Sequence, residues 1–136
     1  MTPPACRSPK LELLRRGGAL ELFADGRILS TSQDWIRFRR ISRPAPEIVL
    51  VGLGLGGSTR YALRALAVER LLVIERLPAV VELFRRRHPV EASDPRLEIL
   101  VAEFPGDLPL EDWTGDVYDL RFPRPVPLRI RAREAL

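Results

Sequence analysis

Four glycines interrupt an apolar run in the segment EIVLVGLGLGGSTRYALRAL, residues 47–66. Gly52, Gly54 and Gly56 follow the run directly, and Gly57 completes an alternative G-x-G-x-x-G spacing. A turn of this kind lets the backbone approach a ligand closely and lets the next helix pack on the strand. The start of that helix would present free N–H groups and a partial positive charge. The segment therefore predicts a ligand site that suits a nucleoside or nucleotide.

Two carboxylates stand where they could complete such a site. Glu75 ends the next apolar run, LLVIE, at the usual place for an acid that accepts hydrogen bonds from both ribose hydroxyls. Glu103 follows a third run and could accept a hydrogen bond from an adenine amino group. The alternatives without a ligand are a plain tight turn, a solvated strand end and an ordinary loop carboxylate. The only histidine, His88, precedes a proline and is expected to end a helix rather than act as a base.

Length and composition limit the function. The 136 residues suffice for one domain with a modest core, and 46% hydrophobic with 29% charged residues is typical of a soluble globular protein. No apolar run of about 18 residues could span a bilayer, and the N-terminus has no apolar core of a secretory signal. We therefore expect a cytoplasmic location and no membrane contact. Cys6 is the only cysteine, which excludes an intramolecular disulfide and predicts no metal site.

The net charge of +4 comes almost wholly from arginine, since Lys10 is the only lysine. Arginine binds phosphate well, so a nucleic-acid partner is one hypothesis. The arginines are dispersed, with small clusters at 37–40, 85–87 and 129–133. Solvated helix and strand faces are the favoured interpretation, and an RNA-binding surface is the alternative.

The pattern of apolar runs predicts a parallel sheet. The segment RPAPE, residues 43–47, marks a boundary because its prolines exclude helix and sheet interior. Strands and helices are then expected to alternate, which gives two right-handed crossovers. The expected order is a strand over 48–51, a helix over 58–70, a strand over 71–75, a helix from Pro78 to 87, a strand over 96–101 and a fourth strand in DVYDLRF.

Upstream of that boundary, Asp25-Gly26 lies between two strand-forming runs and predicts a β-hairpin over about 19–31. The next segment, QDWIRFRRIS, is expected to add a third strand. The sequence thus divides into a leader (1–18), an N-terminal β-hairpin region (19–43) and a Rossmann-like nucleoside-binding domain that lacks the last strands (44–136).

The same segments carry a family resemblance. EIVLVGLGLGGSTRYAL, LLVIERLPAVVELFRRRHP and DPRLEILVAEF resemble, in order and spacing, the nucleotide-binding half of the spermidine synthase family, within the class I S-adenosylmethionine-dependent methyltransferase-like folds. LELFADGRILSTSQDW resembles the N-terminal β-hairpin of that family. Together they cover roughly residues 19–104. The resemblance implies an α/β fold: a shortened doubly wound parallel sheet preceded by a small N-terminal β-hairpin.

The resemblance also implies a ligand and its contacts. Gly52, Gly54 and Gly56 would line the amino-acid and ribose side of a nucleoside, Glu75 would hold the ribose, and Glu103 would lie near the adenine. The cofactor would be S-adenosylmethionine or decarboxylated S-adenosylmethionine, and the activity, if present, that of a transferase.

Several positions depart from the family pattern. Leu55 replaces an acid of the glycine loop, Leu29 replaces a glutamine, and the amine-binding segment is shortened to IRFRRISRP. Arg124 stands where the catalytic aspartate would be, in YDLRFPR. A guanidinium cannot take up a proton and would repel a cationic amine. Aminopropyl transfer to a polyamine is therefore not expected, and the catalytic residues stay unassigned.

Two further hypotheses compete with a nucleoside-binding transferase. A non-catalytic interaction module could use the same scaffold to bind RNA or another subunit, and the edge of the fourth strand suggests a homodimer unless the tail covers it. The glycine spacing with Glu75 is also compatible with NAD.

Overall fold

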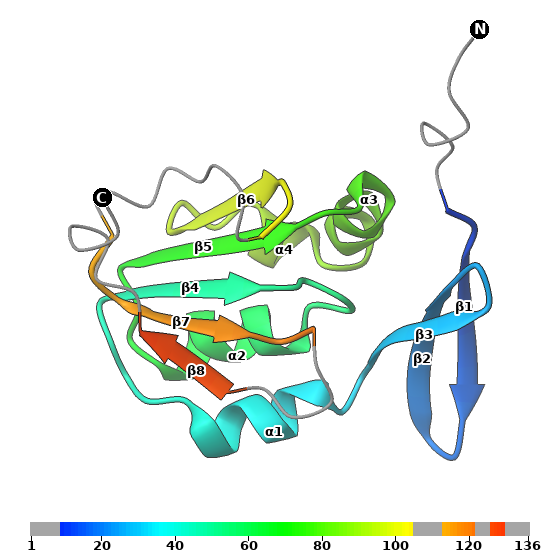
Figure 1. The fold of residues 1–136 in the computed structure, drawn as a ribbon, viewed down its shortest axis with the longest axis horizontal. Coiled ribbons are helices and arrows are strands. Elements are labelled where there is room, and N and C mark those ends of the chain that lie inside the picture. Colours follow the sequence, from blue (N-terminus) through cyan, green and yellow to red (C-terminus); the bar gives the residue numbers. More distant parts are fainter. Residues whose placement is uncertain (1–8, 105–112, 122–125, 130–136) are drawn as a thin grey trace, which may run out of the picture.

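The computed structural model describes residues 9–104, 113–121 and 126–129. These residues form a three-stranded sheet near the N-terminus and a five-stranded sheet that makes the body of the molecule (Figure 1). Within this described part of the chain, no helix is long and apolar enough to cross a membrane.

The larger sheet has the strand order β6-β5-β4-β7-β8. Its first four strands run parallel, which confirms the predicted α/β architecture: β6 (Leu97–Val101), β5 (Arg70–Glu75), β4 (Glu47–Val51) and β7 (Asp116–Asp119). From β4 the chain crosses to β5 and β6 on one side and returns to β7 on the other. The end of β4 is thus the topological switch point at which open α/β sheets bind ligands.

The edge of β7 is occupied by β8 (Val126–Arg129), which pairs with it in antiparallel orientation. The tail of the chain therefore covers the edge from which the sequence predicted a homodimer. The free edges of the described sheet are those of β6 and β8, so a dimer through β7 would require β8 to leave.

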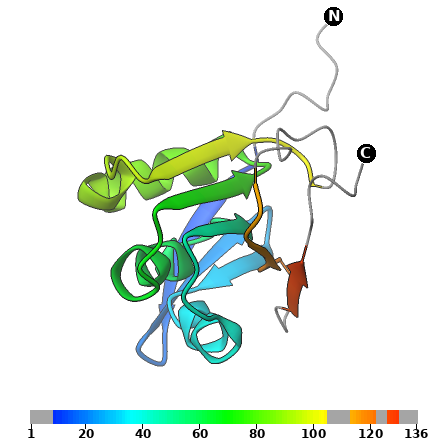
Figure 2. The ribbon, with the colours of Figure 1, turned by 90° about the vertical axis from the view of Figure 1, so that its left-hand side faces the viewer.

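The described helices lie on one side of the larger sheet (Figure 2). They are α1 (Asp34–Ile41), α2 (Gly57–Ala65), α3 (Pro78–Arg87) and the short α4 (Pro89–Ala92). Alternate strand residues face these helices, among them Ile48, Leu50, Leu71 and Val73. The residues between them face the other side, where Val49, Val51, Leu72 and Ile74 form a second apolar cluster with Trp113 and Val117. The strands are buried on both faces, which explains why they read as continuous apolar runs.

The N-terminal sheet consists of β1 (Leu11–Arg16), β2 (Ala19–Ala24) and β3 (Arg27–Thr31). The β2–β3 hairpin turns at Asp25 and Gly26, whose φ angles of 49° and 80° fit the predicted turn. Pairing of β1 with β2 was not anticipated, because residues 11–16 were assigned to a leader.

The segment after the hairpin is a helix, α1, so the predicted third strand over QDWIRFRRIS is wrong. The helix begins at Asp34, with Gln33 as its N-cap, and Asp34 joins this start to β3. Asp34 Oδ2 accepts the N–H of Thr31 at 3.0 Å, and Thr31 Oγ1 accepts the N–H of Gln33 at 3.2 Å. The helix then buries Phe38 against the rings of Tyr61 and Tyr118, with centroids 6.0 and 5.1 Å away. These hydrogen bonds and the aromatic packing together outweigh the strand propensity of this segment.

Candidate functional site

The glycine-rich turn joins β4 to α2 at the switch point of the sheet. Gly52, Gly54 and Gly56 have φ angles of 107°, 54° and 84°, which other residues rarely adopt. The protein itself holds the turn: the N–H of Gly52 donates to Ile74 O at 2.8 Å, and the N–H of Leu55 donates to Ser30 Oγ at 3.1 Å. The turn is therefore fixed by β5 on one side and β3 on the other.

Close packing explains two of the glycines. A Cβ atom at Gly54 would overlap the side chain of Ser30, and one at Gly56 would overlap the ring of Phe84 in α3. Packing within the chain therefore requires glycine at these two positions, whether or not a ligand binds. A ligand could contact only those parts of the turn that this packing leaves exposed.

Glu75 ties the turn to the rest of the site. The residue is 8% exposed; Oε1 accepts the N–H of Leu53 at 3.0 Å and Oε2 accepts the N–H of Leu77 at 3.0 Å. Hydrogen bonds to an ionised acceptor are stronger than neutral ones, so Glu75 fixes both the turn and the start of α3. A carboxylate offers about four acceptor positions, which leaves room for two further hydrogen bonds.

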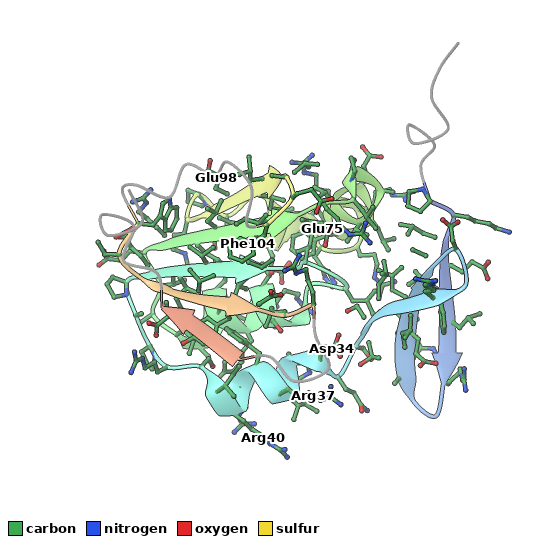
Figure 3. All side chains as sticks on the ribbon, in the orientation of Figure 1. Asp34, Arg37, Arg40, Glu75, Glu98 and Phe104 are labelled. Atoms are coloured by element: carbon green, nitrogen blue, oxygen red, sulfur yellow. The ribbon has the colours of Figure 1, made fainter. Side chains whose placement is uncertain are left out.

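A cavity of about 320 Å³ opens beside Glu75, and we call it the smaller cavity. It brings together Gly54, Glu75 and Glu103, with apolar walls from Leu29 and Phe104. Figure 3 shows Glu75 at the end of β5, above the start of α1. Three of the five predicted binding residues therefore share one cavity.

A second cavity of about 570 Å³, the larger cavity, lies between β3, α1 and the glycine turn. Gly52 and Gly54 form part of its lining, whereas Gly56 lines neither cavity and lies against Phe84 instead. The two cavities adjoin, because four residues line both: Ile28, Leu29, Gly54 and Arg121.

Arg121 lines both cavities and was not predicted from the sequence. Its Nε and Nη2 donate to Asp119 Oδ1 and Oδ2 at 2.9 and 2.7 Å, and its Nη1 donates to the carbonyl of Phe104 at 3.3 Å. Asp119 raises the pKa of Arg121, and Glu103 and Glu75 add to this effect. Burial alone would raise the pKa of Asp119, but the hydrogen bonds from Arg121 outweigh it and lower that pKa. Asp119, the last residue of β7, is therefore ionised and paired with Arg121.

Other sequence candidates lie apart from this site. His88 follows α3, where its N–H donates to Phe84 O at 2.8 Å, and it lines neither of the two cavities. Burial, and then the positive charge of Arg60, lower its pKa. Arg124 lies outside the described residues. No group of three or more potential metal ligands occurs in the described ranges.

The fold has relatives among solved structures, although no protein-family model and no curated protein sequence matches the chain. The spermidine synthase of Thermotoga maritima superposes with a TM-score of 0.56 at 21% identity, over 71% of this chain and 37% of that chain. A spermidine synthase in complex with the transition-state analogue AdoDATO gives a TM-score of 0.49 at 24% identity, over 62% of this chain and 33% of that one.

The likeness to the Thermotoga maritima protein and the strand order define the fold as class I methyltransferase-like, as the sequence resemblance implied. The chain spans little more than a third, 37%, of the Thermotoga maritima protein. At this level of identity the likeness concerns the fold alone.

Gly56 gives a test of the packing constraint. Gly56→Ala and Gly26→Ala both place a side chain at nearly the same φ, 84° and 80°, but only Gly26 has open space around it. Each substitution should cost about 1–2 kcal/mol for the left-handed backbone. Gly56→Ala should cost roughly 1–3 kcal/mol more, because of its overlap with Phe84. Urea unfolding of both variants measures the difference, and equal losses would contradict the packing account.

Asp119 gives a test of the ion pair. Asp119→Asn removes a charge that accepts two side-chain hydrogen bonds and the N–H of Arg121, so the free energy of unfolding at pH 7 should fall by about 1–3 kcal/mol. Because the folded-state pKa of Asp119 is lowered, this stabilisation is present above the unfolded-state pKa, about 4. It is lost as the pH falls through the folded-state pKa. Urea unfolding between pH 7 and pH 3 should show the variant approaching the wild type, and a constant difference would refute the pair's contribution.

Proposed function

We propose that the smaller cavity binds S-adenosylmethionine or a related adenosine compound. The observation that carries this proposal is that Gly54, Glu75 and Glu103 meet in one cavity at the carboxyl end of the parallel strands. Glu75 would accept hydrogen bonds from the ribose hydroxyls with its two remaining acceptor positions. Glu103, which is exposed at the mouth, would accept one from the adenine amino group.

The shape and polarity of the cavity support this assignment. Its volume of about 320 Å³ lies in the lower part of the range usual for small-molecule sites. Leu29 and Phe104 supply apolar surface for a purine, and the two carboxylates supply acceptors at its edges. The position beside the switch point is the usual ligand crevice of open α/β sheets.

The reaction that fits this site is transfer of a group from the bound nucleoside, with methyl transfer favoured over aminopropyl transfer. Aminopropyl transfer needs a carboxylate that attracts a cationic amine and takes up its proton. Asp34 is the one carboxylate among the described residues that lines the larger cavity, and three hydrogen bonds from Ser30 and Thr31 already engage it. A catalytic residue stays unassigned, and a cytoplasmic location stays a prediction.

A second candidate is a non-catalytic binding module on the same scaffold. It is favoured by the fact that both oxygens of Glu75, and the carboxylate of Asp119, are engaged within the protein. Its partner would be RNA, a homodimer mate or the nucleoside itself. Retention of binding without turnover of any acceptor would distinguish it from a transferase.

Titration calorimetry with methylthioadenosine, S-adenosylmethionine and decarboxylated S-adenosylmethionine tests the proposed site. Glu103→Gln should weaken binding of each about tenfold, the value of one hydrogen bond to a charged acceptor. Glu75→Gln should weaken it further, because it also loosens the turn.

Glu98→Gln is the matched control, since Glu98 is exposed on β6 and does not line the cavity (Figure 3). It should bind as the wild type does. No heat with any of the three compounds, from protein shown to be folded by its cooperative unfolding, would overturn the proposed function.

A further inference from the structure

The larger cavity is lined by arginine side chains that the sequence pattern did not place together. Arg37 and Arg40 reach it from α1, and Arg121 reaches it from the end of β7. Among the described residues, Asp34 is the only carboxylate in its lining. Because Arg121 is paired with Asp119, the excess of positive charge in the lining comes from Arg37 and Arg40. Arg37 and Arg40 are exposed and lie three residues apart, so they share one face of the helix.

Asp34 offsets this charge only in part, because its carboxylate is directed to the junction of β3 and α1. Its oxygens accept hydrogen bonds from Ser30 Oγ at 3.0 Å, Thr31 N at 3.0 Å and Thr31 Oγ1 at 3.1 Å. Asp34, Arg37 and Arg40 follow one another along α1, with Asp34 nearest to β3 (Figure 3). The cationic end of this row therefore lies away from the engaged carboxylate.

We propose that the larger cavity is a carboxylate-binding subsite in which Arg37 and Arg40 hold the anion. The guanidinium group presents planar, paired donors that match a carboxylate, and it keeps its charge at any physiological pH. A cationic polyamine would meet repulsion in the same place. This inference rests on the proposed function, because the subsite adjoins the proposed nucleoside cavity. Leu29, Gly54 and Arg121 line both cavities.

Two molecules could supply the carboxylate. One is the nucleoside itself, because the amino-acid tail of S-adenosylmethionine carries a carboxylate that the decarboxylated form lacks. The other is a separate acceptor that carries a carboxylate. Both use the same arginines, and the binding measurements below separate them.

The first measurement uses the protein without nucleoside. Succinate should bind in calorimetry and putrescine should not, and Arg37→Gln with Arg40→Gln in one variant should weaken succinate binding about tenfold or more. Arg39→Gln is the matched control, because Arg39 is exposed on the same helix but does not line the cavity. This control loses the same kind of charge and should keep wild-type affinity.

The second measurement identifies the source. If the tail of the nucleoside is the ligand, S-adenosylmethionine should bind about tenfold more tightly than its decarboxylated form, and the double variant should remove that preference. If a separate acceptor is the ligand, the two forms should bind alike, and succinate should still bind to protein saturated with methylthioadenosine.

The outcomes of the two proposals are distinguishable. Methylthioadenosine has no carboxylate, so its failure to bind overturns the nucleoside site and leaves the succinate result standing on its own. The carboxylate subsite is overturned if putrescine binds at least as well as succinate. It is also overturned if Arg39→Gln weakens succinate binding as much as the double variant does.

Discussion

The carboxylate of Glu75 is the interaction on which the site depends. It is almost fully buried, and it joins the glycine turn at Leu53 to the start of α3 at Leu77. Burying a charge costs free energy unless hydrogen bonds compensate it. Moving the N–H of Leu53 or Leu77 away from Glu75 would therefore destabilise the fold. Those amides in turn fix where β4 and β5 end relative to each other. The walls of both cavities follow from that arrangement.

This arrangement gives the glycines two roles. The turn must pass under Ser30 and beside Phe84, which requires bare backbone whether or not a ligand is present. What remains open on the other side is the two adjoining cavities, with Glu75 and Glu103 in the lining of the smaller one and Arg37 and Arg40 in that of the larger one. Arg121 lies between them, paired with Asp119, and its charge is shared by both cavities. A ligand with a neutral or cationic nucleoside and an anionic group would match this polarity.

The sequence was sufficient for the parallel sheet, because strands buried on both faces give continuous apolar runs and the glycines mark where β4 ends. It was insufficient for α1, where aromatic and β-branched residues suggested a strand. Asp34, an acid in the first turn, and the three-residue spacing of Trp35 and Phe38 were the signals of a helix. Because a strand was predicted there, the sequence did not indicate that Arg37 and Arg40 lie on the same face. Residues three apart share a face in a helix but not in a strand. The contact of Arg121 with Phe104 joins loops distant in the chain, and no local pattern reports it.

The central claim is that Glu75 can serve the fold and a ribose at the same time. A crystal structure of the protein with methylthioadenosine tests this most directly. Ribose hydroxyls should lie within hydrogen-bond distance of the Glu75 carboxylate, with the N–H of Leu53 still bound to it. A nucleoside seated elsewhere, or a smaller cavity closed over Glu75 at saturating ligand, would contradict it.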